Sequence, residues 1–184
     1  MKPIMCVACV PSTNDKPLDN ITEYQKLVGR LINLTLTRLD ISFSVQVLSQ
    51  YMHSPLQSHF DLAFRVLRYL KGSPGKGLHF EKDNSFSLKA YCDADWGKCK
   101  LNRKSFTGYL VYFYNSLVSW KSKKQATISR SFTESEYRAM ASTAFEIVWI
   151  KNLLQDLCVN IELPVKLFCD NSSALQIAAN HVFH

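Results

Sequence analysis

The sequence predicts an α/β fold built on a mixed sheet, in the order β-β-β-α-β-α, with a small helical segment in front of it. Two observations lead to this prediction. Apolar residues recur at helical spacing up to about residue 78 and at alternate positions after it. Three strands are then followed by a helix, a strand and a helix, so the first and fourth strands should be parallel neighbours at the centre of the sheet.

The first 78 residues divide into an irregular segment and a helical one. Residues 1–20 should be irregular because prolines and turn formers interrupt them, and residues 21–78 form a helical domain without a catalytic grouping. Three apolar stripes at helical spacing support the helices, and glycines and a proline at 72–77 end them. The stripes are Leu27, Leu31 and Leu34, then Ile41, Val45 and Leu48, then Leu62, Val66, Leu67 and Leu70.

Residues 79–184 form the second predicted domain, which begins with three strands. In 86–93, apolar Phe86, Leu88, Ala90 and Cys92 alternate with polar or amphipathic residues, which predicts a strand with one buried face. Residues 108–114 are rich in aromatic and branched side chains. A turn at 115–116 would join them to 117–121 as a hairpin.

A long helix is predicted at 133–157, followed by a strand at 165–169 and a helix at 172–179. The long helix should bury one apolar face. The residues expected on that face are Tyr137, Met140, Ala141, Ala144 and Val148.

Composition favours a globular intracellular protein with an anionic partner. The chain carries 22 Lys and Arg against 15 Asp and Glu, a net charge of +7, which fits a polyanion such as nucleic acid. No apolar run reaches the length of a membrane span, so we expect no membrane partner. Several of the six cysteines fall in predicted strands or helices, as small buried hydrophobes do, so a soluble, reducing compartment (cytoplasmic or nuclear) is expected.

Two predicted strands end in the same Cys-Asp dipeptide, at Asp93 and at Asp170. Because chemistry in an open α/β sheet gathers at the carboxyl ends of its strands, adjacent strands would bring these aspartates side by side. Two close carboxylates repel each other unless a proton or a divalent cation lies between them. An oxygen-only site of this kind suits Mg²⁺ or Mn²⁺.

The start of the long helix offers two more acids, Glu134 and Glu136. Thr133 with Glu136 matches a capping box, and so does Ser131 with Glu134. In the second case Glu136 is free to face the sheet, where a buried acid needs a partner such as a metal ion. The sequence does not decide whether Glu136 caps the helix or binds a metal.

Several motifs in order resemble copia-type ribonuclease H domains. Residues 91–96, Y-C-D-A-D-W, are similar to the D-A-D-W opening of these domains, and residues 169–174, C-D-N-S-S-A, to C-D-N-x-S-A. Between them, 129–139 (S-R-S-F-T-E-S-E-Y-R-A) resembles S-R-S-S-T-E-A-E-Y-R-A. Further matches are 102–109, N-R-K-S-F-T-G-Y, and 119–125, S-W-K-S-K-K-Q. The resemblance implies a ribonuclease H-like sheet.

The front of the chain is similar to the segment after the polymerase palm in the same retrotransposon Pol polyproteins. Residues 24–31, Y-Q-K-L-V-G-R-L, and 35–41, T-L-T-R-L-D-I, carry this resemblance, with Leu39 where the family usually has proline. It implies that 21–78 is a remnant of the reverse transcriptase thumb or connection. The polymerase region is absent from the sequence, so no DNA synthesis is expected.

The resemblance also implies roles for the acids. Asp93, Glu136 and Asp170 would be three of four acids that hold two Mg²⁺ (or Mn²⁺) ions and hydrolyse the RNA strand of an RNA–DNA hybrid. The family places its fourth acid beyond the stretch that corresponds to 180–184, where this sequence stops. We therefore expect the last strand and helix of the domain to be missing and the endonuclease to be weak or inactive. The alternative is a non-catalytic nucleic-acid-binding relic of a retroelement.

Two basic segments flank the predicted acids. Arg103, Lys104, Lys123 and Lys124 are expected to contact phosphates, in a salt-sensitive manner that does not depend on base sequence. Three polar residues are expected to contact the sugar–phosphate backbone or the 2′-hydroxyl of RNA, namely Ser105, Gln125 and Ser131. The alternative for the lysines is a solvated surface.

Overall fold

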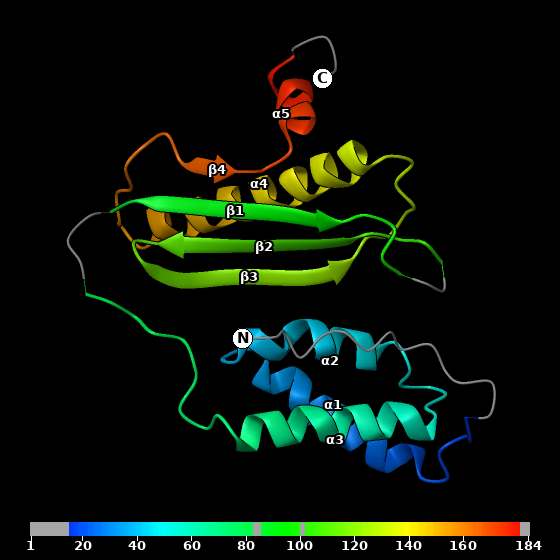
Figure 1. Cartoon of the computed structure of the whole chain (residues 1–184). Coiled ribbons are helices and arrows are strands. Elements are labelled where there is room, and N and C mark those ends of the chain that lie inside the picture. Colours follow the sequence, from blue (N-terminus) through cyan, green and yellow to red (C-terminus); the bar gives the residue numbers. More distant parts are fainter. Residues whose placement is uncertain (1–14, 83–85, 100–101, 181–184) are drawn as a thin grey trace. The chain divides into compact units, whose positions relative to one another are not determined.

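A computed structural model describes residues 15–82, 86–99 and 102–180. The first 14 residues of the predicted irregular segment and residues 181–184 lie outside these ranges. The chain splits into two compact units, Met1–Leu78 and His79–His184 (Figure 1).

The first unit is helical. It contains α1 (Ile21–Leu34), the short 3₁₀ helix η1 (Leu39–Ile41), α2 (Ser42–Ser49) and α3 (Gln57–Lys71). Asn20 caps α1, because its side-chain oxygen accepts a hydrogen bond from the N–H of Glu23 at 3.1 Å. Gly72 follows the last residue of α3, within the glycine- and proline-containing stretch that was expected to end this helix.

The buried face of α1 differs from the predicted leucine stripe. Tyr24 and Val28 are fully buried with Leu31, whereas Leu34 is 37% exposed. The Tyr24 hydroxyl donates a hydrogen bond to the carbonyl oxygen of Leu48 at 2.8 Å, which satisfies its one polar group inside the core. The aromatic residue therefore joins α1 to α2, a role that a search for aliphatic spacing overlooks.

A polar network ties the start of η1 to the end of α3. Arg38 is only 6% exposed and forms an ion pair with Asp40 at 2.8 Å. Asp40 also accepts a hydrogen bond from the Tyr69 hydroxyl at 2.7 Å, and Arg38 donates to the Ser73 carbonyl at 2.9 Å. Hydrogen bonding from Arg38 lowers the pKa of Asp40 to about 2.

In its described residues, the second unit is a four-stranded mixed sheet with two helices. Its elements are β1 (Leu88–Asp95), β2 (Phe106–Phe113), β3 (Ser116–Lys124), α4 (Phe132–Asp156), β4 (Lys166–Phe168) and α5 (Ser172–Ala179). The strand order is β3-β2-β1-β4. β1 pairs antiparallel with β2 and parallel with β4, so the expected parallel neighbours are present.

Two details of the sheet correct the prediction. β4 lies at an edge of the four-stranded sheet, not at its centre, so β1 alone is the inner strand of the parallel pair. β1 begins at Leu88, which leaves Phe86 outside the strand and 45% exposed. It also continues to Asp95, so Asp93 lies within the strand and not at its end.

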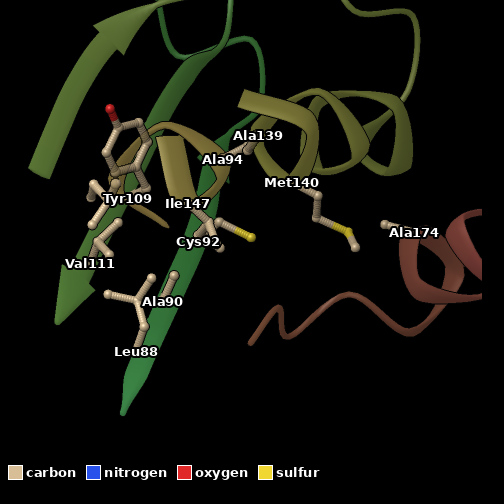
Figure 2. Packing of buried hydrophobic residues seen from close by; sticks show 11 residues of the cluster. Leu88, Ala90, Cys92, Ala94, Tyr109, Val111, Ala139, Met140, Ile147 and Ala174 are labelled. Carbon is tan, nitrogen blue, oxygen red and sulfur yellow. The ribbon is translucent and has the colours of Figure 1, made fainter. Parts of the chain in front are cut away.

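α4 packs on one face of the sheet and contacts β1 and β2 (Figure 1). The core between them joins alternate residues of the strands to the helix, with Leu88, Ala90 and Cys92 pointing from β1 (Figure 2). Figure 2 also shows Tyr109 and Val111 from β2 and Ala139, Met140 and Ile147 from α4.

The buried face of α4 matches the predicted one at Met140, and Tyr137 packs against the core, but the other three predicted residues do not lie on it. Ala141, Ala144 and Val148 are exposed. Phe145 and Trp149, next to them on the helix, are 77% and 60% exposed. The sheet instead receives Glu136, Ala139, Met140, Thr143, Ile147 and Ile150.

Candidate functional site

The two aspartates predicted for the site lie near the carboxyl ends of the parallel strands β1 and β4. Asp93 is in the second half of β1, and Asp170 comes two residues after the end of β4. Tyr91 and Phe168 are partners in the ladder between these strands, so each aspartate stands two residues beyond the same rung. The topology therefore brings both carboxylates to one end of the sheet.

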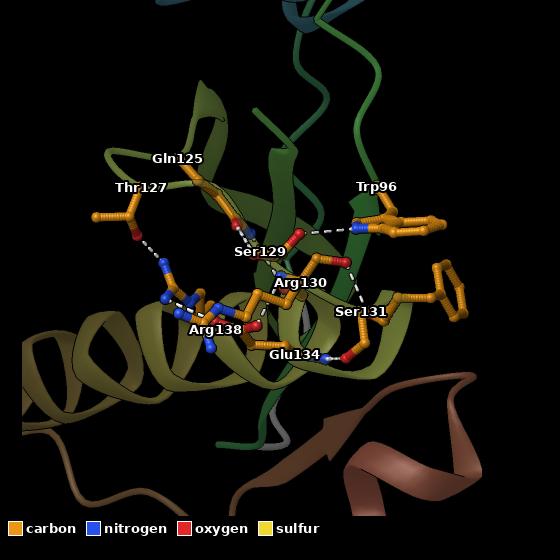
Figure 3. Close-up of polar contacts among 10 residues, drawn as sticks. Trp96, Gln125, Thr127, Ser129, Arg130, Ser131, Glu134 and Arg138 are labelled. Carbon is orange, nitrogen blue, oxygen red and sulfur yellow. Dashed lines mark hydrogen bonds and ion pairs between the residues drawn. The ribbon is translucent and has the colours of Figure 1, made fainter. Parts of the chain in front are cut away.

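The start of α4 decides which glutamate serves as a capping residue. Ser131 is the N-cap, and its hydroxyl oxygen accepts a hydrogen bond from the N–H of Glu134 at 3.0 Å (Figure 3). The carboxylate of Glu134 accepts from the N–H of Arg130 at 2.7 Å and from the guanidinium of Arg138 at 2.7 Å. The Glu134 carboxylate therefore makes its hydrogen bonds at the helix start, and Glu136 is not a capping residue.

Glu136 points from α4 toward the sheet. Its side chain is fully buried, and Oε1 accepts a hydrogen bond from the N–H of Ala94 in β1 at 3.2 Å. Burial raises the pKa of Glu136 to about 7, the Ala94 hydrogen bond opposes that rise, and the charges of Asp93 and Asp170 add to it. The sheet side of α4 therefore holds a carboxylate poised between its protonated and charged forms near neutral pH.

Glu136 forms a compact group of ligand atoms with the end of β4. One ligand atom each from Glu136, Cys169 and Asp170 lies within 4.8 Å of the others, a spacing that could hold a metal ion. The Cys169 thiol donates toward Oε2 of Glu136 at 3.9 Å. Asp93 does not belong to this closest group.

Asp93 nevertheless takes part in the electrostatics of the site. Its pKa is raised by burial and then by the charges of Asp95 and Asp170, against a lowering contribution from Lys98. Asp95 itself forms an ion pair with Lys98, so its charge is partly offset. The structure thus brings Glu136 and Asp170 into direct proximity and places Asp93 close enough to repel both.

Cys92 and Cys169 each directly precede one of the two aspartates, and the sequence analysis gave them no role at the site. The Cys92 thiol contacts the carbonyl oxygen of Phe168 at 3.5 Å. Burial, followed by its interaction with Cys169, raises the pKa of Cys92 to about 12. Cys92 is therefore a protonated packing group, while Cys169 reaches the ligand cluster. The repeated Cys-Asp dipeptide was the signal that could have indicated this.

Gln125 and Ser131, two of the predicted nucleic-acid-binding residues, have internal partners. The Gln125 amide donates to Thr107 Oγ1 and to the Ser135 carbonyl, both at 3.0 Å, and its oxygen accepts from the Ser129 hydroxyl at 2.9 Å (Figure 3). These bonds fix the segment that leads into α4. Ser131 is the helix cap. Both residues therefore organise the position of Glu136 in this conformation.

Ser105 corrects the prediction of a backbone or 2′-hydroxyl contact. It is fully buried, and its hydroxyl oxygen accepts a hydrogen bond from the N–H of Gly97 at 3.1 Å. A side chain without exposed surface cannot touch a nucleic acid in this conformation. Ser105 instead fastens the turn after β1 to the start of β2.

The basic residues differ in how they are used. The Lys104 ammonium group donates a hydrogen bond to the carbonyl oxygen of Ala126 and so joins the two basic segments. Arg103 lies in a turn with φ of 54°, and its side chain is exposed, as is that of Lys123. Neither Arg103 nor Lys123 forms an ion pair with a residue that the structure describes. Lys124, the last residue of β3, is half-buried.

Trp96 completes the frame around the start of α4. Its indole N–H donates to the carbonyl oxygen of Ser129 at 3.0 Å, while the ring remains 51% exposed (Figure 3). The bond links the end of β1 to the segment before α4. Because Asp93 and Glu136 lie on these two elements, it helps to fix their separation.

The fold and the site define a class: a mixed α/β protein whose parallel strand pair and one helix start gather carboxylates at one end of a sheet. The chain is 46% identical over 167 residues to the retrovirus-related Pol polyprotein from transposon RE1 of Arabidopsis thaliana, which is 91% of this chain and 11% of the polyprotein. It is 38% identical over 162 residues to that from transposon TNT 1-94 of Nicotiana tabacum, 88% of this chain and 12% of the polyprotein.

The chain is similar to a segment of these retrovirus-related transposon Pol polyproteins. It spans about a tenth of the length of these two relatives. It is also 40% identical over 128 residues to the secreted RxLR effector protein 161 of Plasmopara viticola, 69% of this chain and 90% of that protein.

Two further comparisons found no match. No protein-family model matches the sequence. No solved structure matches it. Within the described residues, every helix is too short or too polar to cross a lipid bilayer.

Proposed function

We propose that the second unit is a ribonuclease H that hydrolyses the RNA strand of RNA–DNA hybrids with divalent metal ions. The observation that supports this most is the meeting of Glu136 and Asp170, with ligand atoms within 4.8 Å, beside the charge of Asp93. Similarity to a segment of the retrovirus-related Pol polyproteins of transposons also supports the proposal.

The two carboxylates of the ligand group suit a hard cation, whereas the Cys169 sulfur is a softer donor. Carboxylate oxygens of Glu136 and Asp170, with Asp93 nearby, are the ligands that Mg²⁺ and Mn²⁺ prefer. Such ions, when bound, activate a water molecule and stabilise the charge that develops on the leaving oxygen. Their positive charge would also offset the repulsion that raises the pKa of Glu136 and of Asp93.

The chain's own residues hold the acids in place. The Ala94 N–H orients Oε1 of Glu136, while Oε2 accepts from the Cys169 thiol. The Ser131 cap and the Gln125 bonds fix the start of α4, so Glu136 enters the site with little freedom. This arrangement resembles the preorganisation that a metal-dependent nuclease requires.

Exposed cations would hold the substrate. Arg103 and Lys123 are exposed on the segments that flank the end of β1, where they can contact phosphates without reading base sequence. Lys124 is placed on the same strand as Lys123. Lys104 already bonds the Ala126 carbonyl, so we assign it the positioning of these segments.

A cleavage assay tests the proposal. The full chain is incubated with an RNA–DNA hybrid labelled on the RNA strand, with Mg²⁺ or Mn²⁺, beside double-stranded RNA and DNA. We expect cleavage of the hybrid RNA alone. Asp170→Asn should lower the rate by about 100-fold or more, since even the partners behind metal ligands matter by about 10- to 100-fold.

Asp156→Asn is the matched control, because Asp156 is an exposed acid at the far end of α4. It should cleave at the wild-type rate. Equal hybrid cleavage by the wild type and Asp170→Asn would refute the catalytic assignment. Salt-sensitive hybrid binding without cleavage in either metal would support the second candidate, a non-catalytic nucleic-acid-binding module, which the exposed Arg103 and Lys123 favour.

A further inference from the structure

The sheet face opposite α4 carries exposed aromatic rings beside paired lysines. We call this surface the aromatic sheet face and define it by Tyr91, Tyr112 and Phe168 with Lys89 and Lys166. Tyr91 alternates along β1 with Ala90 and Cys92, which point into the core under α4, so it must point the other way. Register places the remaining residues on the same side.

The rings form an ordered row across three strands. Tyr91 of β1 and Phe168 of β4 are stacked, with ring centres 5.0 Å apart and planes 17° apart. Tyr112 of β2 meets Tyr91 edge-on at 6.0 Å and 89°. Tyr91 remains 42% exposed and Phe168 44% exposed, so the row presents aromatic surface to solvent.

The lysines lie at one end of this row as direct partners. Lys89 and Lys166 are opposite each other in the ladder between β1 and β4. Lys89 places its ammonium group 5.8 Å from the centre of the Tyr112 ring and 3.4 Å from Asn115 Oδ1. Neither lysine forms an ion pair with any residue in the described part of the chain. Like charges directly opposite each other destabilise a sheet, and an anion between them would offset this.

The spacing along β1 connects this surface to the acids. Tyr91 stands between Lys89 and Asp93 in the strand. Four residues of strand extend over about 13 Å, so the lysine pair and the acidic end are separated by the ring row. An anionic chain with flat groups would match both features of the surface, because its charges meet the lysines and its flat groups meet the rings.

We propose that the aromatic sheet face binds single-stranded nucleic acid, with bases stacked on Phe168 and Tyr91 and phosphate on Lys89 and Lys166. Unpaired bases are required, since only splayed bases can stack on side-chain rings. The paired lysines and the chain's charge of +7 favour a polyanion over a second copy of this basic chain. This binding needs no metal, so it is independent of the proposed nuclease.

Fluorescence anisotropy tests this binding. The full chain is titrated into a labelled single-stranded oligonucleotide in EDTA, and a length of about 12 nucleotides lies within the usual site sizes. Phe168→Leu keeps apolar bulk and removes the ring, and it should weaken binding on the order of 10-fold. Phe145→Leu is the matched control, because Phe145 is 77% exposed on α4, and it should bind like the wild type. Lys166→Gln should lower the slope of log affinity against log salt by about one.

Circular dichroism of each variant checks that the fold is intact, and Lys166→Gln serves if Phe168→Leu does not fold. Unchanged affinity in Phe168→Leu, or an equal loss in Phe145→Leu, would overturn the proposal. A third result would also overturn it: the wild type self-associates in analytical ultracentrifugation, Phe168→Leu does not, and neither binds the oligonucleotide. The aromatic sheet face would then bind a second copy of the chain. Hybrid cleavage by the same variants, measured separately with Mg²⁺ or Mn²⁺ in place of EDTA, distinguishes this result from the nuclease.

Discussion

Replacing Glu136 by glutamine should remove a pH-dependent loss of stability from the second unit. The pKa of Glu136 is raised from 4.5 to about 7 in the folded chain, so the folded state holds a proton that the unfolded state releases. Stability from this proton is present below about pH 4.5 and is lost as the pH rises through about 7. At about 1.4 kcal/mol per pKa unit, the loss between pH 4.5 and 8 is on the order of 3 kcal/mol.

Urea unfolding at pH 5 and pH 8 in EDTA measures this effect. All three tryptophans, Trp96, Trp120 and Trp149, belong to the second unit, so their fluorescence reports on it specifically. Glutamine keeps an oxygen that can accept the Ala94 N–H bond, and it carries no charge at either pH. We expect the wild type to lose roughly 2–3 kcal/mol more than Glu136→Gln between the two pH values.

Asp156→Asn, which changes an exposed acid of the same helix, should follow the wild type. An equal loss of stability in Glu136→Gln and the wild type between pH 5 and pH 8 would refute the assignment of this pH dependence to Glu136. A variant less stable than the wild type at pH 8 in EDTA would also refute it, because the glutamate charge would then be favourable without a metal.

Three further outcomes follow from the packing. Tyr24→Phe removes the buried hydrogen bond to the Leu48 carbonyl and should lower the free energy of unfolding of the helical unit by about 1 kcal/mol in chemical denaturation. Ser131→Ala removes the cap of α4 and should destabilise the second unit by about 1 kcal/mol, whereas Ser131→Asp should retain most of the stability; equal losses would contradict the cap. Asp40, with its pKa lowered to about 2, gives stability that is present above about pH 4 and lost as the pH falls toward 2, so Asp40→Asn should flatten acid unfolding in that range, followed by circular dichroism.

Much of the sheet could be predicted because its strands alternate cleanly. Leu88, Ala90 and Cys92 are buried as the period of two indicated, and a helix before β4 permits the parallel pairing with β1. The length of β1 could not be read from the pattern. Ala94 continues the buried series past Asp93, but it stands between two aspartates, where a loop is also compatible with the sequence.

The buried face of α4 was predicted correctly only at Met140 and Tyr137, for a physical reason. Apolar residues occur on all faces of this helix, so the spacing of hydrophobic residues cannot identify the face that packs on the sheet. The sheet buries Glu136 and Thr143, whose polar atoms are satisfied by the Ala94 N–H and the Ala139 carbonyl, and leaves Trp149 exposed. Only tertiary partners make that choice favourable, and they are not visible in local sequence.

The site shows the same limit. Ser131 and Thr133 each precede a glutamate by three residues, so local sequence offers two equivalent capping boxes. The Ser131 bond to the Glu134 N–H and the Ala94 bond to Glu136 distinguish them in space. Ser105 was expected to contact the sugar–phosphate backbone or the 2′-hydroxyl of RNA, but its side chain is fully buried and accepts a hydrogen bond from the N–H of Gly97.

The convergence of Asp93, Glu136 and Asp170 on a divalent ion is tested most directly by Mn²⁺ binding. Titration of the full chain, followed by electron paramagnetic resonance of free Mn²⁺ at pH 8, should show bound ion in the wild type and in Asp156→Asn. Asp170→Asn and Glu136→Gln should each weaken that binding by at least about 10-fold. Equal Mn²⁺ binding by all four proteins would contradict the account.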